Sequence, residues 1–120
     1  MPGELMTTLN VWRDRGVAIV APQASLYAYD ARPLADALRQ AEKLTQVGVV
    51  VLALESAVLV DADALDVVLM ESRSYGLRGG RIVLAGVSGP TRALLELCGV
   101  AGHLTVFNGL EAALRELSPA

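Results

Sequence analysis

The sequence has little of what cross-links a chain or builds a bulky core. Among its 120 residues there is one cysteine, Cys98, so no disulfide can form within the chain and thiolates alone cannot hold zinc. Aromatic residues make up 4% of the chain, so a core has to be built from valine, leucine, alanine and isoleucine. We expect Cys98 to be a small core residue. A single thiol fits a reducing compartment.

Long apolar segments and clusters of positive charge are also missing. The longest apolar run lies around Val49–Leu54 and is far shorter than the ~20 residues that a membrane helix needs. The N-terminus has no basic region followed by an apolar one, so we expect no signal peptide. The basic residues are scattered and the net charge is −3, which argues against binding to nucleic acid. We therefore expect a cytoplasmic protein without membrane insertion.

What is present favours one well-filled domain. Hydrophobic residues make up 53% of the chain, and 120 residues allow one domain but leave no room for a second. We expect a single domain over residues 1–120. No repeat, low-complexity tract or linker interrupts it.

Short β-branched runs alternate with segments of helical period. The runs predict strands, and the spacing i, i+3, i+4, i+7 predicts amphipathic helices between them. The expected strands are Leu5–Val11, Val17–Val20, Val49–Leu54, Arg81–Ala85 and Leu104–Phe107, with Arg13–Gly16 as a polar turn. The expected order is β-β-α-β-α-β-α-β-α, an α/β fold with a mixed sheet of about four to five strands flanked by about four helices.

Helix ends carry recognisable capping patterns. Ser88 before Gly89 and Pro90 predicts a helix start, with an apolar side formed by Ala93, Leu94, Leu97 and Cys98. Asn108, with Glu111 three residues later, resembles a capping box.

One segment carries a family resemblance, Val58-Leu59-Val60-Asp61-Ala62-Asp63-Ala64-Leu65. It resembles the place in STAS domains where an apolar strand and a short loop lead into an Asp-Ser-Ser-Gly-Leu motif that opens a helix. The segments 79–85 and 88–100 are similar to the next strand and the following loop and helix of the family. STAS domains include bacterial anti-sigma-factor antagonists, so the resemblance implies a non-enzymatic regulatory domain that binds another protein, without a cofactor or metal.

The motif departs from the family pattern at several positions. Asp63 stands where the family has its phosphorylatable serine, Ala62 replaces the first serine, and Ala64 replaces the glycine. Tyr27 stands, in a loose alignment, for an acidic residue usual after the second strand. The hydroxyl group that a partner kinase would modify is therefore absent.

Two interpretations of Asp63 stay open. A carboxylate at a helix start is an ordinary N-cap that stabilises the helix by about 0.5–2 kcal/mol. Alternatively, its charge imitates part of the phosphoserine charge and fixes the domain in a phospho-like state. Both interpretations predict that phosphorylation of residue 63 does not switch this protein.

The resemblance and the helical spacing together predict a partner-binding surface. Val67 and Met70 would be partly exposed apolar groups beside a charge, unless they cover the edge of the core. The predicted surface comprises Tyr27, Asp61, Ala62, Asp63, Ala64, Val67 and Met70. The implied partner is an anti-sigma factor or a serine-kinase-like switch protein, and a homodimer through the same helix stays open.

Other functions remain as alternatives. Some STAS domains are subunits of signalling complexes, and others belong to lipid-transporter assemblies. A haloacid-dehalogenase-like phosphotransferase would use Asp61 and Asp63 after an apolar strand, with magnesium between them. That chemistry needs a downstream lysine and further carboxylates, whereas the sole lysine, Lys43, lies upstream and no aspartate follows Asp66.

Overall fold

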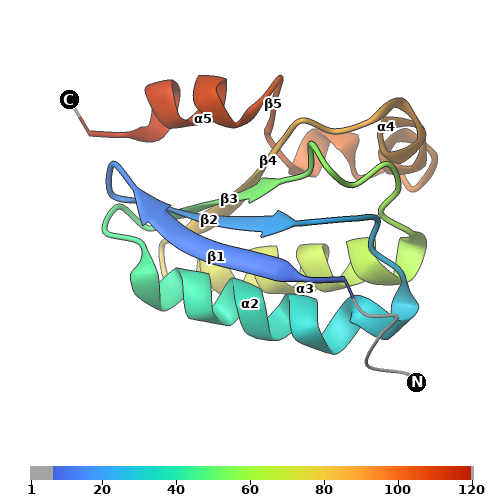
Figure 1. The fold of residues 1–120 in the computed structure, drawn as a ribbon, viewed down its shortest axis with the longest axis horizontal. Helices are drawn as coiled ribbons and strands as arrows, with labels where there is room; N and C mark the ends of the chain where they lie inside the picture. Colours follow the sequence, from blue (N-terminus) through green and yellow to red (C-terminus); the bar gives the residue numbers. More distant parts are fainter. Residues whose placement is uncertain (1–6, 120) are drawn as a thin grey trace.

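The β-branched runs form one five-stranded sheet in a computed structural model that describes residues 7–119 (Figure 1). Its strands are β1 (Leu9–Asp14), β2 (Val17–Pro22), β3 (Val49–Ala53), β4 (Arg81–Ala85) and β5 (Val106–Phe107). The helices are α2 (Ala31–Leu44), α3 (Ala62–Leu77), α4 (Gly89–Leu97) and α5 (Leu110–Leu117), and two 3-10 turns are η1 (Ala28–Asp30) and η2 (Ala101–His103). The expected order of strands and helices is confirmed.

The first two strands form a hairpin at one edge of the sheet. β1 pairs antiparallel with β2, and Arg15 and Gly16 both have positive φ angles of 54° and 83°, as a two-residue turn of this hand requires. The expected four-residue turn is therefore too long, since Arg13 and Asp14 belong to β1. An edge strand with a solvated side accepts such polar residues. Leu5 and Met6, the start of the expected first strand, lie outside the described residues.

The remaining strands pair in parallel and follow chain order across the sheet, β1-β2-β3-β4-β5. Crossovers of one hand that advance in one direction all pass the same face of a sheet. This explains why α2, α3 and α4 contribute to one core, whereas α5, which follows the last strand, covers the opposite face (Figure 1).

The sheet separates two apolar clusters. The larger cluster lies under α2 and α3 and contains Leu34, Leu38, Leu65 and Leu95 among its buried residues. The smaller one lies between the sheet and α5 and is lined by Val17, Ile19, Val51, Val83 and Leu114. Strand β3 contributes to both clusters, as its continuous apolar run predicts for a strand covered on both faces.

The predicted inward side of α4 is wrong for Ala93, Leu97 and Cys98, which are exposed, whereas Leu94 is half-buried and packs against the large core. Thr91 and Leu95 are its buried residues, whereas Leu97 is 84% exposed and Cys98 is exposed too. On the inward side of α4, the hydroxyl of Thr91 accepts a hydrogen bond from the buried backbone N–H of Val60, and Leu95 packs in the large core. In the part of the chain that the structure describes, no helix is long and apolar enough to cross a bilayer.

Candidate functional site

The loop between β3 and α3 runs along the edge where the parallel strands end. Its residues 59–61 pair with the segment before η1, since Leu26 donates a backbone hydrogen bond to Leu59 (2.9 Å) and accepts one from Asp61 (3.0 Å). The side-chain oxygen of Ser25 accepts a further bond from the Leu59 N–H (3.0 Å). These contacts hold the approach to α3 in an extended conformation.

The first residues of α4 brace the same loop from the other side. The Thr91 hydroxyl oxygen accepts the Val60 N–H at 3.0 Å, and the Ser88 hydroxyl donates to the carbonyl of Val58. Ser88 is also the N-cap of α4, as predicted, and accepts from the Thr91 N–H. With both neighbouring segments bonded to its backbone, the loop presents the side chain of Val58, which is 68% exposed.

A third contact fixes the loop between β3 and α3, in this case to α5. The carboxylate of Glu55 accepts the Leu110 N–H at 2.7 Å, so it satisfies an amide in the first turn of that helix. The N-cap residue itself is Gly109, which offers no side chain, and the predicted Asn108–Glu111 capping box is wrong. Glu111 instead pairs with Arg15 across the β1–β2 turn (2.9 Å).

Helix α3 begins two residues earlier than it would if Asp63 were its N-cap. The N-cap is Asp61, whose carboxylate accepts the Ala64 N–H at 3.0 Å. Asp63 is the second residue of the helix and its side chain is exposed, so the prediction that it caps α3 is wrong. Its charge still lies in the first turn, where the helix dipole favours a carboxylate.

Two tyrosines stand beside this helix start. The rings of Tyr27 and Tyr29 lie 5.7 Å apart, and the side chains are 37% and 48% exposed. Beneath them Asp30 is buried, and its carboxylate accepts backbone N–H groups from Tyr27 (2.9 Å) and Thr7 (2.8 Å). Partial desolvation raises the pKa of Tyr29, and the nearby carboxylates of Asp30 and Asp61 raise it further.

The structure keeps most of the predicted binding residues on the surface but not all. Ala62, Asp63 and Tyr27 are exposed, Asp61 is half-buried, and Met70 is 66% exposed. Ala64 is fully buried, so its predicted place on the surface is wrong, because each residue of a helix is rotated by about 100° from the one before it and this rotation turns Ala64 toward the sheet. Val67 packs against the core and forms the border of that side.

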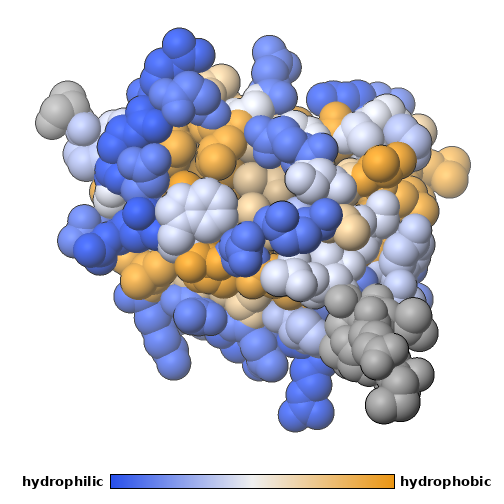
Figure 2. Space-filling view, in the orientation of Figure 1, coloured by the Kyte–Doolittle hydropathy of each residue, from blue (hydrophilic) through white to orange (hydrophobic). Residues whose placement is uncertain are grey.

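Two exposed residues extend this surface beyond the prediction, Tyr29 and Val58. The sequence signal for Tyr29 is its alternation with Tyr27, whereas nothing in the apolar run 57–60 marks Val58 as exposed. We call the resulting set the docking surface: Tyr27, Tyr29, Val58, Asp61, Ala62, Asp63 and Met70. In the space-filling view, apolar surface lies at the end of the molecule formed by this loop and α4, with polar residues around it (Figure 2).

The geometry does not assemble a phosphotransferase site around Asp61 and Asp63. The carboxylate of Asp61 is engaged as a helix cap. Lys43 lies in the last turn of α2, two residues before Thr45, whose hydroxyl contacts Gly16 at the opposite end of the sheet. Within residues 7–119, no three His, Cys, Asp or Glu side chains are placed to hold a metal ion.

Comparison with known families and structures gives a consistent match. The model of the STAS domain family matches residues 8–113. A search of curated protein sequences finds no match.

Similar solved structures include an anti-sigma factor antagonist from Mycobacterium paratuberculosis, with a TM-score of 0.80, 18% identity, and coverage of 94% of this chain and 95% of that chain. The unphosphorylated anti-sigma factor antagonist SpoIIAA has a TM-score of 0.74 and 16% identity, and the match covers 94% of this chain and 99% of that one. A sulfate transporter family protein from Wolinella succinogenes has a TM-score of 0.73 and 24% identity, over 85% and 84% of the two chains. At these identities the likeness concerns the fold.

Proposed function

Because the chain belongs to the STAS domain family, we propose that it is a regulatory domain that binds another protein through the docking surface. The family match over residues 8–113 and the continuous sheet support one domain over residues 1–120. The proposed partner is an anti-sigma factor or a serine-kinase-like switch protein, since similar structures include anti-sigma factor antagonists. We propose no catalytic role for Asp61 or Asp63.

One observation supports this proposal most directly. Exposed apolar and aromatic side chains lie beside carboxylates, on loop segments whose backbone is held in place by hydrogen bonds. Val58 and Met70 are 68% and 66% exposed, and Tyr29 lies near Asp61. Tyrosine and methionine are enriched at protein interfaces, and a frame that is already ordered loses little entropy on binding. The bonds from Ser25, Ser88 and Thr91 provide that order.

Asp63 gives the proposed interface a permanent negative charge. Because Asp61 caps α3, the carboxylate of Asp63 does not serve as the helix cap. It is exposed and can therefore face a partner. Phosphoserine carries nearly two negative charges, so a single carboxylate reproduces part of its field. We propose that this charge replaces a reversible switch at residue 63.

A binding measurement with one surface variant tests the docking surface. The chain is titrated calorimetrically with the serine-kinase-like anti-sigma proteins encoded in its source genome. We expect one of them to bind, Met70→Lys to weaken that complex at least about tenfold, or about 1.4 kcal/mol, and Glu116→Lys to leave it unchanged. Glu116 is an exposed residue of α5, on the opposite face of the sheet.

The thermal midpoint of Met70→Lys should equal that of the wild type, because the side chain is mostly exposed. The proposal is contradicted if Met70→Lys and Glu116→Lys bind the partner with equal affinity, or if none of the anti-sigma proteins binds the wild type.

A kinase assay tests the charge at residue 63. With ATP and the same partner, Asp63→Ser should gain one phosphate at residue 63 by intact-mass and peptide analysis. The wild type should gain none. Phosphate on Ser56 or Ser72 of the wild type would mean that the switch has moved along the chain, and would overturn the permanent-charge proposal.

A second candidate is a subunit of a larger assembly, either a signalling complex or a transporter assembly. Met70 and Leu77 are seven residues apart on α3, hence on one side of it, and are 66% and 89% exposed. Such a stripe suits contact with a second copy of the chain. If α3 mediates such a contact, sedimentation velocity should show a dimer that Leu77→Lys dissociates, whereas a monomer at all concentrations excludes self-association through α3.

A further inference from the structure

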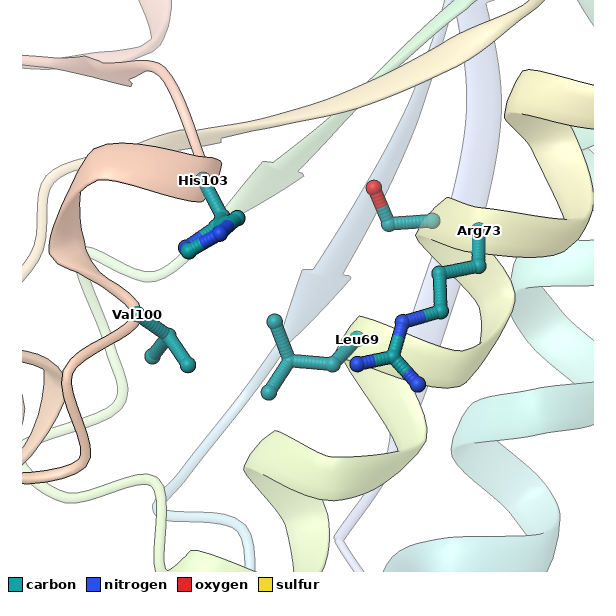
Figure 3. Close-up of a pocket in the computed structure, with 5 residues that line it drawn as sticks. Leu69, Arg73, Val100 and His103 are labelled. Atoms are coloured by element: carbon teal, nitrogen blue, oxygen red, sulfur yellow. The ribbon is translucent and has the colours of Figure 1, made fainter.

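A cavity of about 180 Å³ opens between α3 and the turn η2 (Figure 3). Its walls come from Leu69, Ser72 and Arg73 on α3, and from Val100 and His103 at η2. Leu69 lies eight residues beyond Asp61 on the same side of the sheet, roughly 12 Å along the helix axis. The cavity therefore lies away from the start of α3, although Met70 of the docking surface is the chain neighbour of Leu69.

The polar part of the cavity is rich in hydrogen-bond donors. The guanidinium of Arg73 and the imidazole of His103 approach the opening from two different elements (Figure 3). Ser72 adds a hydroxyl group. Arg15, Arg39 and Arg78 each pair with a carboxylate, whereas within residues 7–119 the Arg73 side chain makes no such pair. The donors of Arg73 are thus available to an anion.

The other part of the cavity is apolar. Leu69 and Val100 face it, and both side chains pack with their other sides against the large core. These walls are fixed by the core, so they cannot turn away to be replaced by polar groups. A ligand that fits both parts has an anionic head and a hydrocarbon tail.

The size of the cavity limits the ligand to a small molecule. An apolar cavity of about 150 Å³ in another protein holds one benzene molecule, which has six non-hydrogen atoms. The cavity of about 180 Å³ between α3 and η2 has similar room. A planar carboxylate matches the paired donors of a guanidinium, which makes it the fitting head group.

We propose that this cavity binds a short-chain organic carboxylate of about six non-hydrogen atoms. The carboxylate lies between Arg73 and His103, and the hydrocarbon tail lies on Leu69 and Val100. Inorganic phosphate reaches the same donors but leaves the apolar walls in contact with water, so it binds more weakly. This site does not depend on the proposed regulatory function.

An NMR titration of the ¹⁵N-labelled chain tests the proposal with three probes: butyrate, butyramide and inorganic phosphate. Butyramide has the shape of butyrate without its charge. We expect saturable shifts for the amides of residues 69–73 and 100–103 with butyrate at millimolar concentration. Butyramide and phosphate should each bind at least about tenfold more weakly.

Two arginine variants complete the test. Arg73→Gln should abolish the saturable butyrate shifts, whereas Arg115→Gln should retain the wild-type affinity. Both residues are exposed, so the rest of each spectrum reports an intact fold, and Arg115 lies on α5 across the sheet.

Three results would overturn the proposed site: butyrate shifts that are equally strong in Arg73→Gln, equal binding of butyramide and butyrate, or shifts confined to residues outside the cavity.

Discussion

At the start of α3, two aspartates two positions apart have different tasks. Asp61 holds the Ala64 amide, while Asp63 is exposed in the first turn. The sequence could not assign the cap, because either residue suits an N-cap by type. The assignment follows from the pairing of Asp61 with Leu26, which keeps residue 61 extended and starts the helix at Ala62.

Alanine at each position separates these tasks. Asp61→Ala should lower the free energy of unfolding by about 1 kcal/mol, the usual loss for an N-cap. Asp63→Ala should cost at most a few tenths of a kcal/mol, since an exposed charge near a helix dipole contributes about 0.3–1 kcal/mol before screening by salt. Urea unfolding of both variants measures the difference. A larger loss for Asp63→Ala would return the cap to residue 63.

Cys98 is a second residue at which local pattern and packing disagree. Its place among Ala93, Leu94 and Leu97 predicted a core position, yet the thiol is exposed because Thr91 and Leu95 face inward. The folded chain should therefore react fully with a thiol reagent such as dithionitrobenzoate without denaturant. We expect the same number of reactive thiols in native buffer and in 6 M guanidinium. Protection in native buffer would place Cys98 in the core.

At the scale of elements, α5 depends on a residue far from it in sequence. Glu55, in the loop before α3, accepts the Leu110 amide and packs against Gly86 and Gly109. Gly86 has a φ of +71°, and a Cβ there would lie 2.6 Å from the Cγ of Glu55, so the loop requires glycine at this position. No sequence pattern links residues 55 and 110, which is why the cap was assigned to Asn108.

Removing this carboxylate should loosen α5. Glu55→Ala leaves the Leu110 N–H without its acceptor, so we expect a loss of about 1 kcal/mol and faster hydrogen exchange in the first turn of α5. Glu116→Ala, on the same helix but exposed, serves as the matched control and should change neither quantity. Unchanged exchange at Leu110 in Glu55→Ala would show that the contact does not stabilise α5.

At the scale of the whole molecule, the packing of α2 against α3 centres on Tyr75. Its side chain is fully buried and its hydroxyl donates to the Leu38 carbonyl. Burial raises the pKa of Tyr75, and the carboxylates of Glu42 and Glu71 raise it further. The folded state therefore holds this proton more tightly than the unfolded chain does.

The stability of the fold should fall in alkali. A raised pKa in the folded state contributes stability that is complete below the ordinary tyrosine pKa of about 10 and is lost as the pH rises above it. We expect the free energy of unfolding to fall by up to about 1.4 kcal/mol per pH unit above pH 10. Urea unfolding between pH 8 and 11 measures this slope.

In Tyr75→Phe the slope should be smaller, and the variant should be less stable at pH 8 because the Leu38 carbonyl loses its donor. The same slope in Tyr75→Phe would assign the effect to other groups. Tyr29→Phe controls for the exposed tyrosine whose pKa is also raised.

The global arrangement was predictable from the sequence, whereas several local contacts were not. Continuous apolar runs such as Val49–Ala53 and the apolar stripe on α2 indicate burial directly, and the alternation of strand and helix patterns along the chain gave the order of elements. The side of α4 that faces inward, the cap of α5 and the exposure of Val58 depend on contacts between distant segments. A sequence pattern indicates which residues are buried, but it does not indicate which distant group a polar side chain forms a hydrogen bond with.

The placement of α5 has a consequence for how the chain is made. Each strand adds to the edge left by the one before it, so the sheet and the helices on its first face can assemble as the chain leaves the ribosome. The second face, with Val17, Ile19, Val51 and Val83, has to wait for α5. A nascent chain whose synthesis has just passed β5 therefore exposes an apolar sheet face. During this interval a chaperone would find the largest apolar surface to bind.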